Sequence, residues 1–485
     1  MKMDGETEQL HVVLFPFMAH GHMIPTLDMA RLFAARGVKT TLITTPLNAP
    51  TFTTAIQKGK NTSRPPLINI QVFRFPAQEA GLPQGCENLE QALGPGVMDQ
   101  FFKASAMLKE QLEQFLDKTR PDCLMAGMIF TWATDSASKF NIPRLVFHGT
   151  CYFSLCVGEI LRLHQPYKNV SSDQEPVNTF LLPSLPHQIH MTRLQLSEEL
   201  WSNKETDYKK RSSKVKESEL ESFGVIVNSF YELEPDYADF FKKDLGRRAW
   251  HIGPVSLYNR SNQEKAQRGK TSSIDQHECL KWLNSKKPDS VIYICFGSTI
   301  HLIPSQIHQV LMALEATGQE FIWVVRNEDD LGGFEQKMTG KGLIIRGWAP
   351  QMLILEHEAI GAFVTHCGWN STLEGIAAGL PMVTWPMFAE QFYNEKLVTD
   401  ILKIGIPVGA KKWTTVPSIE DVIKQNAIEK ALREIMEGDA AEERRCRSKE
   451  FKNMAWKALE EGGSSYSDLS ALIHELRGLS TKNHN

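Results

Sequence analysis

The sequence predicts an α/β protein built from two doubly wound domains that face each other across a cleft. Short β-branched and aliphatic runs alternate with helical patterns along the 485 residues, a polar stretch interrupts them at 256–273, and a second series then follows. Near-continuous apolar strands separated by crossover helices are typical of parallel sheets covered on both faces. At about 100–200 residues per domain, the length accommodates two to four domains.

Each series forms one expected domain. The first, residues 1–255, has strands expected at 11–15, 39–44, 68–73, 123–126 and 144–147, with an amphipathic helix at 26–36. Residues 256–273 contain Leu257 as their single large aliphatic and are expected to form a linker. The second domain, residues 274–460, has strands expected at 291–296, 321–325, 342–345, 362–365 and 382–385. A charged helix from Ala441 breaks at Gly462 and Gly463, and we expect residues 461–485, with a short amphipathic helix at 467–476, to pack back on the first domain.

Composition excludes several classes of protein. With 53 Lys and Arg against 57 Asp and Glu, the chain lacks the basic excess of a nucleic-acid-binding protein, and 42% hydrophobic residues exclude an acidic disordered chain. Eight cysteines without a CxxC pair indicate reduced thiols rather than disulfides or a zinc site. The polar first nine residues do not resemble a signal peptide, and no apolar run reaches the ~18–20 residues of a membrane span. We expect a soluble, cytoplasmic monomer that binds neither nucleic acid nor metal.

The most informative stretch is residues 362–377, an apolar strand that runs into His366, Gly368, Asn370 and Ser371 before a helix begins. Glycine lets the backbone approach a ligand, and free N–H groups at a helix start attract anions. Neutral donors and a histidine suit a diphosphate that must leave with its nucleotide. The alternative is a turn with a helix N-cap. Glu374 lies at capping-box spacing from Ser371, or one turn into the helix where its carboxylate could bind ribose hydroxyls.

Two neighbouring features favour the nucleotide interpretation. Trp348, in the loop Trp348-Ala-Pro-Gln351, could stack on a planar base, although a loop tryptophan can also serve only in packing. Glu390 and Gln391 follow Pro386 and offer an acid and an amide for adjacent sugar hydroxyls, or form an ordinary solvated helix start.

Residues 348–391 resemble the signature box of plant family 1 UDP-sugar-dependent glycosyltransferases. The shared residues are Trp348-Ala-Pro-Gln351, His366-Cys-Gly-Trp-Asn-Ser371, Glu374-Gly375, Pro381, Trp385-Pro386 and Glu390-Gln391. Members of this family have the GT-B fold, with the acceptor mostly on the N-terminal domain and the donor on the C-terminal one. The resemblance extends from His11 to the C-terminal helix and agrees with the two series.

The resemblance implies a role for each residue of the donor site. Trp348 stacks on uracil, and the backbones of Ala349 and Gln351 bind its edge. His366, Asn370 and Ser371 hold the diphosphate near Gly368, with help from Ser298. Glu374 binds the ribose, and Trp369, Glu390 and Gln391 hold the sugar. The terminal Gln391 is similar to glucosyl-specific members, and Glu390 replaces a more common Asp. UDP-glucose is then a co-substrate, and no cofactor or metal is expected.

In the first domain, a loop with two histidines follows the first strand. Glycosyl transfer to a hydroxyl needs a base that removes its proton. The family pattern Gly-His-x-x-Pro falls on His22, so the resemblance assigns the base to His22 rather than His20, although both could merely pack. Phe17, His20, Gly127 and Phe388 are expected to contact a small, hydrophobic, hydroxylated acceptor.

Gly127 departs from the family pattern, which has an Asp at this position to orient the histidine. Losing such a partner costs up to ~10⁴ in rate in triad enzymes. The chain is then an impaired variant, or another acid substitutes, or the acceptor needs little help. A phenol, with a pKa near ~10, would tolerate a poorly oriented base. Asp122 and Asp135 are the nearest acids in sequence.

The leading functional hypothesis is an inverting glucosyltransferase that converts UDP-glucose and a phenolic, flavonoid or terpenoid hydroxyl into a β-glucoside and UDP. The alternative is a nucleotide-sugar-binding protein whose catalysis is impaired because of Gly127. A dinucleotide oxidoreductase is disfavoured, because the loop after the first strand has one glycine where Gly-x-Gly-x-x-Gly needs three.

Overall fold

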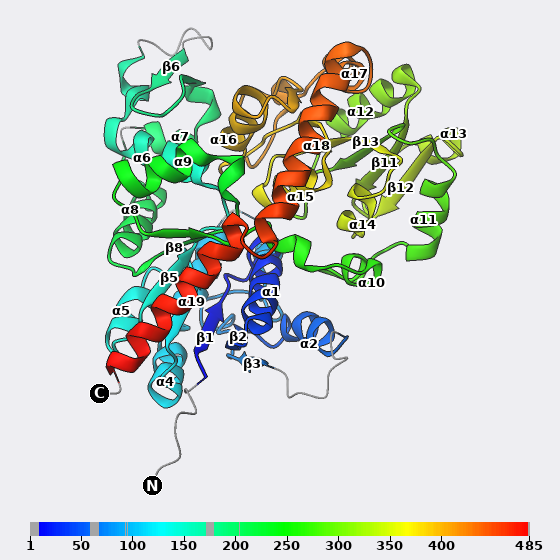
Figure 1. Ribbon diagram of the computed structural model, residues 1–485. Coiled ribbons are helices and arrows are strands. Elements are labelled where there is room, and N and C mark those ends of the chain that lie inside the picture. Colours follow the sequence, from blue (N-terminus) through cyan, green and yellow to red (C-terminus); the bar gives the residue numbers. More distant parts are fainter. Residues whose placement is uncertain are drawn as a thin grey trace.

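A computed structural model describes residues 9–58, 67–92, 94, 96–170, 179–202 and 204–483. Two separate parallel sheets dominate it, one in each half of the chain (Figure 1). Their strands are linked by helices, and the predicted α/β architecture is therefore confirmed. Among the described residues, no helix is both long and apolar enough to cross a bilayer.

The N-terminal sheet has seven strands. Their order is β3 (Ile68–Val72), β2 (Lys39–Thr44), β1 (His11–Phe15), β4 (Cys123–Gly127), β5 (Arg144–Phe147), β8 (Gly224–Val227) and β9 (Ala249–His251). The associated helices are α1 (His20–Ala35), α2 (Ala49–Lys58), α3 (Val97–Ala106), α4 (Lys109–Thr119), α5 (Ala133–Ser138), α6 (Tyr152–His164), α7 (Glu198–Trp201), α8 (Asp207–Leu220) and α9 (Pro235–Asp239). A hairpin of β6 (Thr179–Leu182) and β7 (Ile189–Thr192) lies outside the sheet.

The C-terminal sheet has six strands, in the order β12 (Gly342–Arg346), β11 (Glu320–Val325), β10 (Val291–Cys295), β13 (Ile360–Thr365), β14 (Met382–Thr384) and β15 (Gly405–Pro407). Its helices are α11 (Gln276–Asn284), α12 (Pro304–Thr317), α13 (Phe334–Lys337), α14 (Gln351–Leu355), α15 (Trp369–Ala378), α16 (Gln391–Lys396), α17 (Gln425–Met436) and α18 (Asp439–Leu459). Strands β10 and β13 are buried along their whole length. This is why they read as uninterrupted apolar runs.

The two halves of the chain are packed against each other. One hydrophobic core contains residues of α6 and of the C-terminal sheet together, and Ser154 Oγ donates to Asn394 Oδ1 of α16 at 2.7 Å. The last helix, α19 (Ser464–Asn483), returns to the N-terminal half, where Leu469, Leu472 and Leu476 join the core beneath β1 (Figure 1). α19 is longer than the predicted 467–476.

The segment expected to be a linker has its own structure. A 3₁₀ turn at Val255–Tyr258 buries Leu257 fully, and α10 (Asn262–Ala266) begins at a capping box in which Ser261 accepts from Glu264 N. The segment then runs between the two halves. The domain boundaries themselves stay predictions.

Candidate active site

The predicted site residues follow the carboxyl ends of central strands in both sheets. In the N-terminal sheet the strand order reverses between β1 and β4, where the loop before His22 and Gly127 lie. In the C-terminal sheet it reverses between β10 and β13, the strands that precede Ser298 and His366. Ligands of open α/β sheets bind at such points.

The start of α15 is free of side-chain caps. Its N-cap is Gly368, no side chain caps it, and the first described backbone bond at this end runs from Thr372 N to Gly368 O. Asn370 and Ser371 therefore do not cap the helix, and its first N–H groups point out as an anion site. The capping-box interpretation of Ser371 and Glu374 is wrong, because the helix already begins at Trp369.

His366 is held between two glycines. A Cβ on Gly297 would lie 2.6 Å from His366 Cε1, and a Cβ on Gly368 would lie 2.4 Å from its Nε2, so a side chain at either position would displace the imidazole. Burial lowers the pKa of His366 to about 4, against a smaller opposite effect of a Cys295 backbone hydrogen bond. His366 is thus neutral at pH 7, and a bound diphosphate would be needed to charge it.

Gln351 links the predicted ribose and phosphate residues. Its Nε2 donates to Ser371 Oγ at 3.1 Å and to Glu374 Oε2 at 2.8 Å, while Tyr293 Oη donates to its Oε1 at 3.3 Å. The other oxygen of Glu374 is paired with Arg268. The structure therefore brings Gln351, Ser371 and Glu374 together as a fixed group. Ala349, buried beside them, accepts from Gln351 N at 2.8 Å.

Trp348 is half-buried at the edge of this group. Its backbone N–H donates to Ser273 Oγ at 2.9 Å, and its carbonyl accepts from Ser273 N at 2.8 Å. Its indole ring lies 5.7 Å from the His20 ring and 5.7 Å from Lys270 Nζ. Trp348 thus has neighbours from two separate segments, the loop and helix start around His20 and residues 270–273.

The predicted sugar-binding residues lie where α16 begins. Gln391 Oε1 accepts from Met387 N at 2.8 Å and from Phe388 N at 3.1 Å, which leaves the NH₂ group of this buried amide as the part able to meet a sugar. Burial raises the pKa of Glu390, against hydrogen bonds with its own backbone, Asn394 and the Trp369 backbone. The Trp369 indole N–H instead donates to Asn228 O at 2.7 Å, so only its backbone can serve a sugar.

His22 lies in an aromatic setting on α1. Phe17 meets its ring edge-on at 5.9 Å between centroids and itself stacks on Phe102. Burial lowers the pKa of His22 to about 4, and the charge of His148 lowers it further. His148 pairs with Glu219 through Nε2 at 2.7 Å, so this acid serves His148 rather than His22. His22 is therefore a neutral imidazole over the physiological range.

Gly127, at the end of β4, is closely surrounded. A Cβ there would lie 3.2 Å from Phe17 N and 3.5 Å from Phe17 Cβ, and its carbonyl accepts from Arg144 Nη2 at 3.2 Å. Asp122, the nearest acid in sequence, is engaged elsewhere, since it accepts from His11 N at 2.7 Å. No carboxylate of the described residues is hydrogen-bonded to His22.

The remaining acceptor candidates are divided between two places. His20 pairs through Nδ1 with Glu90 at 2.6 Å, and Glu90 also binds Lys270 and Ser298, on the donor side of the site. Burial would raise the pKa of Glu90, but these partners lower it to about 2. Phe388 is partly buried beside Gln391. His20 is therefore engaged on the donor side, and the acceptor roles of Phe17, His20, Gly127 and Phe388 stay predictions.

A hydrogen bond joins the two halves at the centre of the site. Pro25 has no N–H to give to the carbonyl four residues earlier, Gly21, and this carbonyl accepts from Asn370 Nδ2 at 2.6 Å. The predicted phosphate residue thus contacts the residue before His22. Among the described residues, four predicted site residues carry a buried polar atom without a hydrogen-bond partner: His22 Nδ1, Trp348 Nε1, His366 Nδ1 and Asn370 Oδ1. Such atoms are costly when they lack a partner, and a bound ligand or water could supply one.

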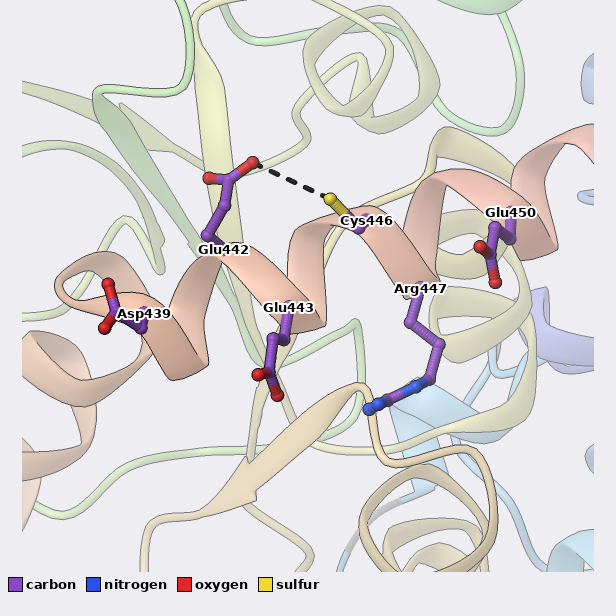
Figure 2. Close-up of a pocket in the computed structure, with 6 residues that line it drawn as sticks. All are labelled: Asp439, Glu442, Glu443, Cys446, Arg447 and Glu450. Atoms are coloured by element: carbon purple, nitrogen blue, oxygen red, sulfur yellow. Dashed lines mark hydrogen bonds between the residues drawn. The ribbon is translucent and has the colours of Figure 1, made fainter.

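Arg268 and Glu90 were missed in the sequence. Both lie in polar segments far from the box, and their pairing depends on the folded chain alone. A separate hollow on α18 is lined by Glu442, Cys446, Arg447 and neighbouring acids of one helix face (Figure 2). There Cys446 Sγ lies 3.7 Å from Glu442 Oε1, and no predicted site residue takes part.

Comparisons with known proteins agree with this geometry. Residues 212–445 match the family model described as "UDP-glucoronosyl and UDP-glucosyl transferase". The chain is 56% identical over 481 residues to scopoletin glucosyltransferase of Nicotiana tabacum, covering 98% of this chain and 100% of the relative. It is 52% identical to anthocyanin 3′-O-beta-glucosyltransferase of Gentiana triflora, covering 97% and 98%.

A solved structure gives the same result for the fold. Glycyrrhiza uralensis UGT73P12, complexed with glycyrrhetinic acid 3-O-monoglucuronide, superposes with a TM-score of 0.91 at 41% identity, covering 98% of this chain and 97% of the other. With these likenesses over nearly its whole length, the chain belongs to the plant family 1 UDP-sugar-dependent glycosyltransferases and has their GT-B fold.

Proposed function

We propose that the protein transfers glucose from UDP-glucose to a phenolic hydroxyl of a small molecule, with inversion, and releases a β-glucoside and UDP. The observation that carries this proposal is the hydrogen bond from Asn370 to the Gly21 carbonyl, which places His22 beside the start of α15. An inverting displacement needs a base on one side of the sugar and stabilisation of the leaving diphosphate on the other. His22 and α15 are suited to these two tasks.

The leaving diphosphate would be stabilised without a metal ion. The N–H groups of Asn370 and Ser371 have no side-chain cap, and they follow Gly368, where an added Cβ would lie 2.4 Å from His366 Nε2. A helix start and a histidine that gains a proton can offset the charge that develops on the phosphate oxygen. Ser298 would add a hydroxyl after exchanging Glu90 for the phosphate.

The state of His22 favours acidic hydroxyls. A base whose pKa is about 4 and which has no orienting carboxylate removes a proton from an aliphatic alcohol with difficulty. A phenol, whose pKa is near ~10, ionises far more easily. The relatives named for scopoletin and for anthocyanin support an acceptor of this kind. The edge-on contacts of Phe17 with His22 offer an aromatic surface beside the base.

Glucose is the proposed sugar because of Gln391 and Glu390. The fixed amide NH₂ of Gln391 can donate to a neutral hydroxyl, and the carboxyl of Glu390 can accept from one, whereas it would repel a uronate. The test supplies equal UDP-glucose, UDP-galactose and UDP-glucuronate with a simple phenol, and the products are resolved by mass and chromatography. We expect the glucoside to predominate. Equal use of UDP-glucuronate would contradict the sugar assignment.

One observation favours a second candidate, a nucleotide-sugar-binding protein with impaired catalysis. Gly127 provides no carboxylate, and His22 Nδ1 has no hydrogen-bond partner among the described residues. If this candidate is right, the protein binds UDP-glucose but glucosylates none of a panel of phenols. Turnover of any one of them would exclude it.

A further inference from the structure

The segment after α10 lies inside the donor site instead of passing around it. Arg268 is inserted between the two halves of the chain, with its side chain 10% exposed. Its Nε donates to Asp28 Oδ2 of α1 at 2.8 Å, and its Nη1 is paired with Glu374 of α15. One guanidinium therefore joins the helix that carries His22 to the helix that begins at the anion site.

Both partners of Arg268 are buried carboxylates, 1% and 5% exposed at the side chain. Asp28 has a second partner in Asn259 Nδ2 at 2.9 Å. Glu374 has Gln351, which leaves lone pairs on the same carboxylate free for further donors. An uncompensated carboxylate at this depth would be costly, and Arg268 removes that cost while fixing the direction in which Glu374 points.

The residues that follow Arg268 pack closely against the indole of Trp348. A Cβ on Gly269 would lie 2.3 Å from Trp348 Cζ2, and φ at Gly269 is +95°, so this position requires glycine on both counts. Lys270 then pairs with Glu90 at 2.6 Å. The Trp348 backbone N–H donates to Ser273 Oγ, and the Trp348 carbonyl accepts from Ser273 N. Residues 268–273 thus contact both Glu374, the predicted ribose-binding residue, and Trp348, the predicted uracil-binding residue.

We propose that Arg268 is a positioning residue for donor recognition, which holds the Glu374 carboxylate on the ribose hydroxyls of the bound nucleotide. The inference rests on the proposed function, since it takes Glu374 as the ribose-binding group. Arg268 itself contacts the protein rather than the sugar. Its fork matches two carboxylates at once, which a lysine ammonium cannot do with the same geometry.

The test compares UDP with 2′-deoxy-UDP by titration calorimetry on the unaltered protein and on Arg268→Gln. We expect Arg268→Gln to raise the dissociation constant of UDP at least about tenfold, the scale of a lost charge-assisted contact. The dissociation constant of 2′-deoxy-UDP should change less than about threefold, because the hydroxyl that Glu374 would accept from is missing. Arg268→Lys should restore part of the UDP affinity.

The matched control is Lys265→Gln. Lys265 lies in the same segment, is 11% exposed at its side chain, and forms an ion pair at 2.7 Å with Glu356, which is 20% exposed and is not a partner of Arg268. Lys265→Gln should leave the dissociation constants of UDP and 2′-deoxy-UDP within about twofold of those of the unaltered protein. Equal losses of UDP affinity in Lys265→Gln and Arg268→Gln would overturn the proposal. If Arg268→Gln does not fold, Arg268→Lys and the double variant Arg268→Gln with Asp28→Asn, which removes the unpaired charge on α1, serve in its place.

Three results would overturn the inference. The first is unchanged UDP affinity in folded Arg268→Gln, and the second is an equal loss for both nucleotides, which would indicate general damage. The third is tighter UDP binding, because Arg268 would then be an obstacle that the donor displaces. If the unaltered protein binds neither nucleotide, the proposed function fails and this inference fails with it. Normal binding by the unaltered protein separates the two cases.

Discussion

Among single residues, Gly127 has the largest influence on how the base can work. Its missing side chain would point at Phe17, in the loop that leads to His22. Arg144 is a cation nearby, since its Nη2 donates to the Gly127 carbonyl, and its charge would favour the ionised form of a carboxylate introduced here. The structure shows no other acid in this role among the described residues.

We therefore expect Gly127→Asp to raise kcat, by about tenfold or more for alcohols and by less for phenols, because alcohols depend more on an oriented base. Steady-state rates with one phenol and one alcohol of similar size measure this. The matched control, Gly127→Ala, adds the Cβ 3.2 Å from Phe17 N without the charge and should not raise either rate. Unchanged or lower rates in Gly127→Asp for both acceptors would mean that the glycine provides room instead.

Gln391 is the residue on which sugar choice depends. Its Oε1 is held by Met387 N and Phe388 N, so a histidine in its place loses this anchoring and presents a ring nitrogen to the sugar. We expect Gln391→His to lower the ratio of kcat/KM for UDP-glucose over UDP-galactose about tenfold, the scale of one hydroxyl contact. Gln114→His, on the exposed face of α4, is the control. A ratio equal to that of the control would remove Gln391 from sugar recognition.

At the scale of elements, the start of α15 is the structure on which UDP binding depends. Gly368→Ala would place a Cβ 2.4 Å from His366 Nε2 and force the imidazole out of the anion site. We expect the dissociation constant for UDP to rise at least about tenfold. Gly318→Ala is the control, because φ is +64° there and no atom lies within 4 Å, so it strains the backbone without touching the site. Calorimetry that finds equal UDP affinity in both variants would contradict the assignment.

The elements that the sequence predicted are those with long apolar runs. Strands β10 and β13 are fully buried and were read correctly, with ends within two residues. Strands β8, with four residues, and β9 and β15, with three each, were not predicted, nor was the hairpin β6–β7. Strands β5 and β14 are equally short and were predicted, so length alone does not decide which strands a sequence reveals. Short strands are fixed by their neighbours in the sheet rather than by their own residues.

The candidate site divides in a similar way. Gln351 begins α14, whereas Ser371 and Glu374 lie on α15. These three residues could be grouped because the stretch 348–391 resembles the signature box of the family, and the structure brings them together. Arg268 could not, because it is 106 residues from Glu374 and its segment has the composition of an ordinary linker. Ion pairs between distant segments leave no periodic trace in a sequence.

For the whole molecule, buried titratable groups predict an optimum of stability near pH 6.5. Burial lowers the pKa to about 4 in four histidines: His11, His22, His251 and His366. Because the unfolded chain binds their protons first, their contribution is present above pH 6.5 and is lost as the pH falls towards 4. Burial raises the pKa of Glu234 to about 7 and of Glu395 to about 8, so their contribution is lost as the pH rises through these values.

We expect the melting temperature to fall by about 2 °C between pH 6.5 and 5, and to fall again between pH 6.5 and 8. Scanning calorimetry at constant ionic strength measures both limbs. Glu395→Gln keeps an oxygen that can accept from Thr384 Oγ1 and removes a contribution that decreases from pH 4.5 to about 8. It should therefore flatten the alkaline limb and steepen the acid limb. A melting temperature that still rises up to pH 8 would contradict the raised pKa values.

The transfer reaction itself provides the most direct test. UDP-glucose and a hydroxycoumarin are incubated with the unaltered protein and with His22→Ala, and proton NMR follows the sugar at C1 while UDP release is measured. We expect the unaltered protein to form a β-glucoside and UDP in equal amounts. His22→Ala should lose at least about a hundredfold in rate while binding UDP as before. An α-glucoside, UDP binding without transfer, or undiminished transfer by His22→Ala would contradict inverting catalysis by His22.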